Sequence, residues 1–182
     1  DQTIKNMTEV ITHRGPDSDG IFTDDYISMG FRRLSIIDLG TGSQPIYNED
    51  KSLVLTFNGE IYNYQDLRKE LIELGHTFYT ESDSEVLIHG FEQWQEKLLD
   101  KLRGMFGFAI YNMKDNSLFI ARDFFGIKPM HYAQIGNSLV YGSEIKSILE
   151  FPGFEKKFNY RTLDNYLSFQ YAVPPETFFE GV

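Results

Sequence analysis

Two adjacent arginines, Arg32 and Arg33, are the first residues in the chain whose type and spacing could bind a ligand. They lie in the apolar segment 31–38, which is typical of a strand, so their side chains must point to opposite faces and one of them inward. An inward arginine needs an anionic partner, because an unpaired buried charge is too costly. That partner is either a carboxylate of this chain, in a structural ion pair, or the carboxylate of a ligand held by the guanidinium fork.

A second pair, Asn58 and Gly59, follows the mostly apolar segment 52–57, which is typical of a strand covered on both faces. The pair predicts an Asn-Gly turn that ends this strand, but a side-chain amide and the next backbone N–H are also the two donors of an oxyanion hole. Asp83 either stabilises a helix N-terminus or binds an ammonium group. An arginine, an oxyanion pair and an aspartate of this kind together describe a site for a free amino acid with a reactive carbonyl.

Other chemistries receive little support. The turn 16–20 resembles the start of a calcium loop. Counted from Asp17, however, the twelfth position is Ser28, where such a loop carries Glu. Ser43 lies in Gly-Ser-Gln-Pro, which is typical of a turn and not of a serine hydrolase. The four histidines are scattered, and only Glu85 and His89 stand one helical turn apart. We therefore expect no metal site.

The elements that position these residues are short hairpins around adjacent helices. Helical spacing begins at Ile4, a second helix runs from Asn63 to a stop at Gly75, and a third starts in a capping box at 82–85 and extends to Leu98. Further short helices are predicted over 143–149 and 162–169, and strands within 21–38, 52–57, 106–111, 118–122 and on both sides of a turn at 136–137. Without βαβ alternation, this order favours a layered α+β domain.

Length and composition narrow the classes of function. The 182 residues suit one domain, and the absence of cysteine excludes disulfide scaffolds, thiolate zinc sites and cysteine nucleophiles from the chain as given. With 17 Lys and Arg against 27 Asp and Glu, the net charge of −10 opposes binding to nucleic acid or an anionic membrane surface. No apolar run approaches the ~20 residues of a membrane span and no signal-peptide pattern is present, so we expect a cytoplasmic protein.

Seven motifs follow one another along the whole chain: His13-Arg14-Gly15-Pro16-Asp17, Arg33-Leu34-Ser35-Ile36-Ile37-Asp38, Asn58-Gly59-Glu60-Ile61-Tyr62-Asn63, Ser82-Asp83-Ser84-Glu85, Gly104-Met105-Phe106-Gly107-Phe108-Ala109, Arg122-Asp123 with Gly126-Ile127-Lys128-Pro129, and Ser143-Glu144-Ile145-Lys146. In this order they resemble the class II glutamine amidotransferase domain of glutamine-hydrolysing asparagine synthetases. The resemblance implies an N-terminal-nucleophile (Ntn) hydrolase fold, an αββα sandwich of two antiparallel sheets, with residues 1–182 forming one amidotransferase domain.

The resemblance also implies a role for each matching residue. Arg33 would bind the α-carboxylate of glutamine, and Glu60 and Asp83 its α-amino group. Asn58 and Gly59 would form the oxyanion hole. Further contacts would come from the segment after the arginine, which consists of Leu34, Ser35, Ile36 and Ile37.

The chemistry implied is attack of an N-terminal cysteine thiolate on the glutamine side-chain amide, which gives a glutamyl thioester and ammonia. The α-amino group of that cysteine, with an ordinary pKa of about 7.7–8.0, serves as the base. A C-terminal synthetase domain then uses the ammonia, with ATP and Mg²⁺, to amidate aspartate, while the amidotransferase domain itself needs no cofactor. The cysteine with its strand and the synthetase domain are absent from this sequence, so we expect a fragment cut at both ends that does not hydrolyse glutamine alone.

Two alternatives remain open. The chain could be a silent glutamine-binding or scaffold domain that has lost its cysteine naturally, or an amidotransferase domain that serves a different acceptor. The expected partners are L-glutamine and the synthetase domain of the same chain, and the resemblance also allows a homodimer.

Overall fold

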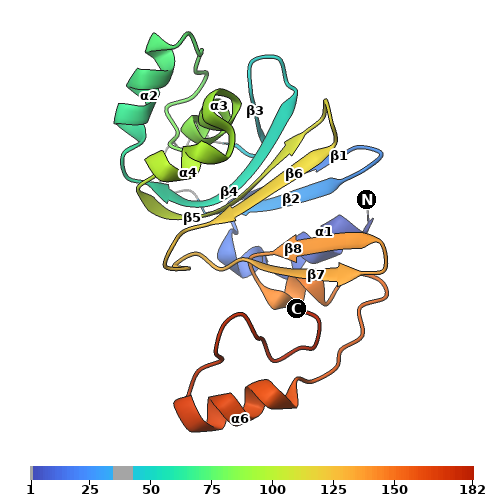
Figure 1. Ribbon diagram of the computed structural model, residues 1–182. Helices are drawn as coiled ribbons and strands as arrows, with labels where there is room; N and C mark the ends of the chain where they lie inside the picture. The colour runs from blue at the N-terminus through green and yellow to red at the C-terminus, as the bar shows by residue number, and fades with distance from the viewer. Residues whose placement is uncertain (1, 35–42) are drawn as a thin grey trace.

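The computed structural model describes residues 2–34 and 43–182, which form four layers, αββα (Figure 1). Its central sheet is antiparallel and has the order β3 (Ile46–Tyr47), β4 (Leu53–Ile61), β5 (Gly104–Asn112) and β6 (Ser117–Arg122). Two hairpins, β1 (Ser18–Thr23) with β2 (Ser28–Arg33) and β7 (His131–Ile135) with β8 (Ser138–Gly142), lie on one face of that sheet. The expected α+β sandwich is confirmed.

The central sheet is covered on both faces, as the apolar segment 52–57 predicts. Leu55 and Phe57 of β4 pack into the cluster shared with the helices, whereas Val54 packs on the opposite face with Met29 of β2 and Tyr111 of β5. This division follows the two-residue period of a strand. Because both faces of β4 are buried, its residues are apolar at successive positions. The polar residues of the strand lie towards its C-terminal end.

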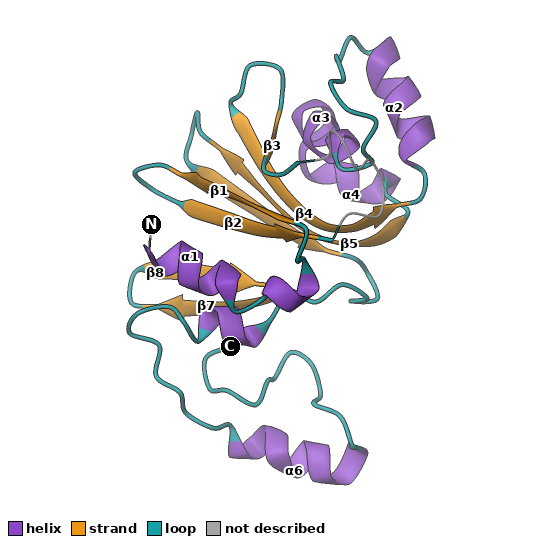
Figure 2. Cartoon of the chain, turned by 180° about the vertical axis from the view of Figure 1, so that it is seen from behind, coloured by secondary structure: helices purple, strands orange, loops and turns teal. Residues whose placement is uncertain are grey.

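The helices form the two outer layers. On one side of the sheet lie α2 (Tyr64–Glu73), α3 (Glu85–Trp94) and α4 (Leu98–Lys101), and on the other side α1 (Gln2–Glu9) and α5 (Ile145–Ile148) cover the hairpins (Figures 1 and 2). Met7 of α1 and Ile148 of α5 pack on Ala133 and Val140 of the β7–β8 hairpin. Short 3₁₀ helices cover Thr12–Arg14 and Gln95–Lys97, and the second of these divides the helix expected to extend to Leu98.

The last helix, α6 (Tyr160–Phe169), stands apart from the sheets in both views (Figures 1 and 2). It is held by the segment that follows it, where Asn159 Nδ2 donates to Glu176 and Phe178 contacts the rings of Phe158 and Tyr166. No helix in residues 2–34 or 43–182 is both long and apolar enough to span a membrane.

The second β layer consists of two hairpins. Within the described residues, β1–β2 and β7–β8 are separate two-stranded units, with no ladder between them. A cavity lined by Gly30 of β2 and Gly142 of β8 lies at this place. The two hairpins therefore form one layer without sharing hydrogen bonds.

The predicted turn at Asn58-Gly59 is wrong. Strand β4 continues to Ile61, with Asn58 opposite Gly107 and Gly59 opposite Phe106 of β5. The local Asn-Gly preference gives way because the partner strand is long enough to pair with all nine residues of β4. Both residues therefore lie inside a ladder and not in a flexible loop.

The predicted capping box at 82–85 is also wrong, although a helix does start there. The Glu85 carboxylate does not return to the N-cap but accepts the backbone N–H groups of Tyr79 and Thr80, both at 2.7 Å. Ser82 Oγ accepts the N–H of Ser84 at 3.3 Å. The expected stop of α2 at Gly75 is confirmed, since the φ of +101° at that glycine ends the helix.

Candidate functional site

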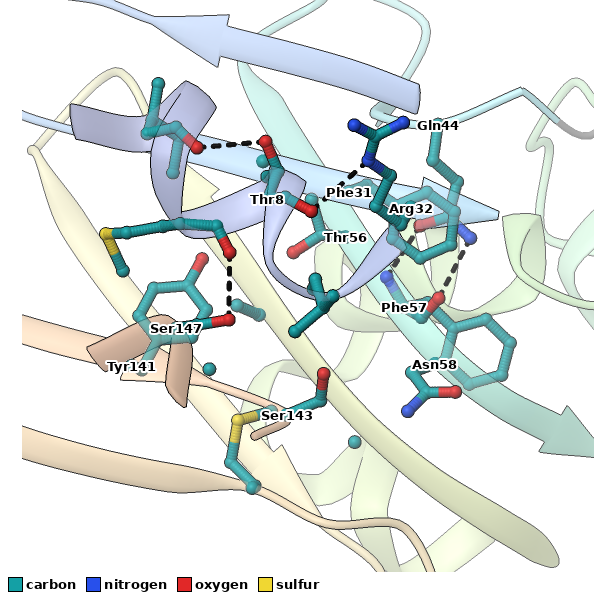
Figure 3. Close-up of a pocket in the computed structure, with 18 of the residues that line it drawn as sticks. Thr8, Phe31, Arg32, Gln44, Thr56, Phe57, Asn58, Tyr141, Ser143 and Ser147 are labelled. Carbon is teal, nitrogen blue, oxygen red and sulfur yellow. Dashed lines mark hydrogen bonds between the residues drawn. The ribbon is translucent and has the colours of Figure 1, made fainter. Parts of the chain in front are cut away.

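A cavity of about 660 Å³ lies between the central sheet and the two hairpins (Figure 3). Its wall contains six of the nine residues predicted for the site: Arg33, Leu34, Asn58, Gly59, Glu60 and Asp83. The other three, Ser35, Ile36 and Ile37, lie outside the described residues. The fold thus gathers residues from β2, β4 and the start of α3 around one space.

The two arginines have different surroundings, as expected from strand alternation. Arg32 Nε donates to the Thr8 carbonyl at 3.2 Å (Figure 3), and its Nη1 lies 3.7 Å from the Asp19 carboxylate. Arg32 therefore has the structural ion pair that we considered for this pair of residues. Arg33 is buried, and both arginines are among the residues that line the cavity. A guanidinium is a group that can hold a carboxylate in two parallel hydrogen bonds.

Asn58 and Gly59 both line the cavity, and the side-chain amide of Asn58 is drawn in Figure 3. Gly59 has no room for a side chain, because a Cβ there would lie 2.1 Å from the Met105 carbonyl oxygen and 2.8 Å from Phe106 Cα. The close approach of β4 and β5 thus requires glycine at this position. The ladder with β5 fixes the backbone of both residues, and a fixed donor geometry is what stabilisation of an oxyanion requires.

Asp83 is buried, and its Oδ2 accepts the N–H of Ile61 at 2.8 Å. Burial raises the pKa of the Asp83 carboxyl above its usual range; the Ile61 N–H opposes this effect, and the negative charge of Glu60 adds to it. Two carboxylates side by side at a cavity form a site that a cation would stabilise. An ammonium group is a cation of suitable size, with three donors.

Gln44 is a residue of the site that the sequence analysis missed. Its side chain accepts the N–H of Phe57 at 2.6 Å and donates to the Phe57 carbonyl at 3.0 Å, so it pairs with β4 as a neighbouring strand would (Figure 3). These two bonds fix the backbone next to Asn58. Only the turn signal of Gly-Ser-Gln-Pro was visible in the sequence, and that signal does not indicate a long-range partner.

Asp123, in the loop after β6, does not line the cavity but positions a loop that does; from the sequence it was named only within a motif. Its carboxylate accepts the N–H groups of Phe106 at 3.2 Å, Ile127 at 2.8 Å and Lys128 at 2.9 Å. Burial opposes ionisation of this carboxyl, but the N–H groups of Lys128 and Ile127 outweigh it and lower the pKa of Asp123. The ionised aspartate thus ties the loop to β5, and Lys128 of that loop lines the cavity.

Comparison with known proteins identifies the family. The profile of the glutamine amidotransferase domain matches residues 1–182. The chain belongs to this family.

Among the relatives of this amidotransferase domain, asparagine synthetase [glutamine-hydrolyzing] 1 of Bacillus subtilis is 46% identical over 97% of the chain. Asparagine synthetase [glutamine-hydrolyzing] 3 of the same organism is 39% identical over 100% of it, and the enzyme of Brassica oleracea is 40% identical over 81%. The chain spans 28%, 30% and 25% of these proteins. The resemblance to amidotransferase domains of asparagine synthetases is therefore confirmed.

Solved structures support the Ntn-hydrolase fold of the domain. Glutamine phosphoribosylpyrophosphate amidotransferase from B. subtilis, complexed with ADP and GMP, superposes with a TM-score of 0.65 at 21% identity, over 81% of this chain and 40% of that one. A structure described as the allosteric regulatory enzyme of purine biosynthesis gives 0.57 at 25% identity, over 68% and 29%. The roles of individual site residues remain predictions.

Proposed function

We propose that this amidotransferase domain is the glutaminase half of an asparagine synthetase. It binds L-glutamine in the cavity and releases ammonia for the ATP-dependent amidation of aspartate in a C-terminal domain. The observation that carries the proposal is the convergence of a buried arginine, the Asn58-Gly59 pair and two acidic residues on one cavity wall. These groups complement the carboxylate, the side-chain amide and the ammonium of glutamine.

Each group has a defined task in the proposed reaction. Arg33 holds the α-carboxylate, while Glu60 and Asp83 hold the α-ammonium, so that the side-chain amide reaches Asn58 and Gly59. A cysteine thiolate attacks the amide carbon. The resulting oxyanion accepts hydrogen bonds from the Asn58 side-chain amide and the Gly59 backbone N–H. The C–N bond breaks, ammonia leaves with a proton relayed by the cysteine's α-amino group, and water hydrolyses the thioester to glutamate.

The nucleophile must come from outside the given sequence, which contains no cysteine. The cavity lies between two hairpins that share no ladder among the described residues, so a segment carrying the cysteine has room to enter between them. We therefore propose that the chain as given binds glutamine and does not hydrolyse it.

The partner that we propose for the domain is the synthetase domain of a longer chain. Large apolar side chains are exposed on α6 and beyond it, and in the loop after β6. They are Tyr160, Tyr166, Leu167, Phe169, Tyr171, Phe124 and Phe125. Exposed apolar side chains of this kind suit docking to another domain. ATP and Mg²⁺ belong to that partner in this proposal, with no cofactor in the amidotransferase domain, and the proposed biosynthetic role places the protein in the cytoplasm.

Replacement of Arg33 tests the proposed glutamine site. We expect Arg33→Ala to weaken L-glutamine binding by roughly 10- to 100-fold, because a hydrogen-bonded charge pair contributes about 1.5–3 kcal/mol. Saturation-transfer NMR on the 182-residue chain measures this binding even when it is weak. Arg161→Ala on α6, where the side chain is 82% exposed, is the matched control. Equal affinity in both variants would remove Arg33 from the site.

The lack of cysteine favours one second candidate, a silent glutamine-binding or scaffold domain. The two candidates share the glutamine site and differ in whether an N-terminal cysteine with its strand is encoded upstream of Asp1. Sequencing of the parent transcript separates them, because an N-terminal cysteine excludes the silent domain.

A further inference from the structure

Four potential metal ligands meet in the helical layer, on the other face of the central sheet from the cavity. Glu49 lies in the turn between β3 and β4, His76 follows the end of α2, and His89 and Glu92 lie on α3. One ligand atom from each residue lies within 4.8 Å of those of the others. The glutamine site uses none of these side chains.

The orientation of His89 is the first observation that points to a cation. This residue is fully buried, and its Nε2 lies 3.2 Å from Oε1 of the buried Glu85. Because Glu85 is an acceptor for two backbone N–H groups, Nε2 donates to its carboxylate, and in the neutral form of the ring Nδ1 presents a lone pair. Among the described residues Nδ1 makes no hydrogen bond, although Glu49 Oε2 lies 3.2 Å away.

His76 repeats this arrangement from another segment. Its Nε2 lies 3.2 Å from the side-chain oxygen of Gln93, and its Nδ1 faces Glu49 Oε1 at 3.3 Å and Glu92 Oε2 at 4.0 Å. Histidines that bind metals commonly donate the second ring N–H to a carboxylate or carbonyl in this way. With Nε2 as the donor in both rings, each neutral imidazole directs a lone pair towards a carboxylate oxygen of Glu49. A cation between these groups, either a proton on Nδ1 or a metal ion, makes such a contact favourable.

We propose that Glu49, His76, His89 and Glu92 bind one zinc-class divalent cation. Two imidazole nitrogens and two carboxylates suit Zn²⁺, whereas Mg²⁺ and Ca²⁺ prefer oxygen ligands alone. Zn–N and Zn–O bonds of about 2.0–2.1 Å place neighbouring ligands of a tetrahedron roughly 3.3 Å apart. The carboxylate of Glu49 lies at a similar spacing from both histidines, 3.2 Å from Oε2 to His89 Nδ1 and 3.3 Å from Oε1 to His76 Nδ1, so it faces each imidazole with a different oxygen.

The surroundings of the cluster fit a structural ion that enters from solvent. The side chains of Glu49 and Glu92 are 30% and 37% exposed, whereas that of His89 is inaccessible. An ion here would join three segments that are separate in the sequence. One of them is α3, which begins two residues after Asp83, so the ion would also steady the helix beside the glutamine site.

Metal binding by the untagged, metal-free 182-residue chain tests the proposal. We expect one Zn²⁺ per chain after gel filtration, measured by elemental analysis, and a Tm that rises with Zn²⁺ concentration but not with equal Mg²⁺ or Ca²⁺. Co²⁺ should bind in its place and give the intense visible absorption of a four-coordinate ion. A chain that retains no Zn²⁺ and shows no shift in Tm would overturn the proposal, and would indicate that a proton on an imidazole occupies the position instead.

Two conservative variants locate the ion without removing the buried His89. We expect His76→Gln and Glu92→Gln each to weaken Zn²⁺ binding by roughly 10- to 100-fold. The matched controls are His13→Gln, whose side chain is 55% exposed and contacts Glu144, and Glu96→Gln. Each variant is compared with its own metal-free Tm, so a change in intrinsic stability does not affect the comparison. Equal Zn²⁺ affinity in the variants and the controls would show that the ion binds elsewhere and would overturn the assignment.

Discussion

Replacing Asp83 with Asn is expected to raise the stability of the free domain and to remove most of its affinity for glutamine. Burial and the charge of Glu60 raise the pKa of Asp83 in the folded state above the unfolded value of 3.8. Folding therefore becomes less favourable as the pH rises from 3.8 through the raised pKa. At neutral pH, where Asp83 is ionised in the folded state, the whole of this loss in the free energy of unfolding remains. An asparagine avoids this penalty and can still accept the N–H of Ile61.

The same variant cannot pair with the ammonium of glutamine, so we expect affinity to fall by roughly 10- to 100-fold. Thermal unfolding between pH 3.5 and 8, together with NMR titration of glutamine, measures both effects. Asp164→Asn, on the exposed surface of α6, is the control and should change neither. If Asp83→Asn is less stable than the parent at neutral pH, the ionised Asp83 carboxylate does not destabilise the fold. If glutamine affinity is unchanged, Asp83 has no role in binding.

Gly59→Ala is expected to have the largest effect on stability. The added Cβ would meet the Met105 carbonyl, Phe106 Cα and the Phe57 ring at 2.1–2.8 Å. Two of these atoms belong to the backbone and cannot rotate away, so β4 must separate from β5 at the oxyanion pair. We expect the free energy of unfolding to fall by about 3 kcal/mol, measured by urea denaturation.

Gly107→Ala is the matched control for this variant, because it lies in the same pair of strands opposite Asn58. Its added Cβ would lie 3.3 Å from the end of the flexible Met130 side chain, which can move. We expect a loss of less than about 1 kcal/mol. Equal losses in the two variants would show that the close approach at Gly59 is not what requires glycine.

The layers and the cavity residues could be predicted because their signals are local or carried by motifs. The apolar segment before Asn58 indicated a strand covered on both faces, and β4 packs Leu55 and Val54 into different clusters. The hairpin turns and the stop at Gly75 were also readable, since they depend on a few neighbouring residues. The resemblance then placed Arg33, Asn58 and Asp83 at one site, and the cavity contains them all.

The errors arose where a distant partner outweighed a local preference. Asn58-Gly59 is a good turn sequence, but pairing with β5 keeps both residues extended. Glu85 has the right spacing for a capping box, yet its carboxylate binds Tyr79 and Thr80. The contacts of Gln44 with Phe57 and of Glu49 with His89 join segments that no periodicity connects. Such contacts depend on tertiary structure and cannot be deduced from spacing.

The measurement that tests the central claim most directly is glutamine hydrolysis by a longer form of the chain, extended before Asp1 by a strand whose first residue is cysteine. We predict release of glutamate and ammonia, a trapped glutamyl thioester detectable by mass spectrometry, and loss of both when that cysteine is replaced by alanine. The 182-residue chain should show neither. A longer chain that folds, binds glutamine and does not hydrolyse it would contradict the account.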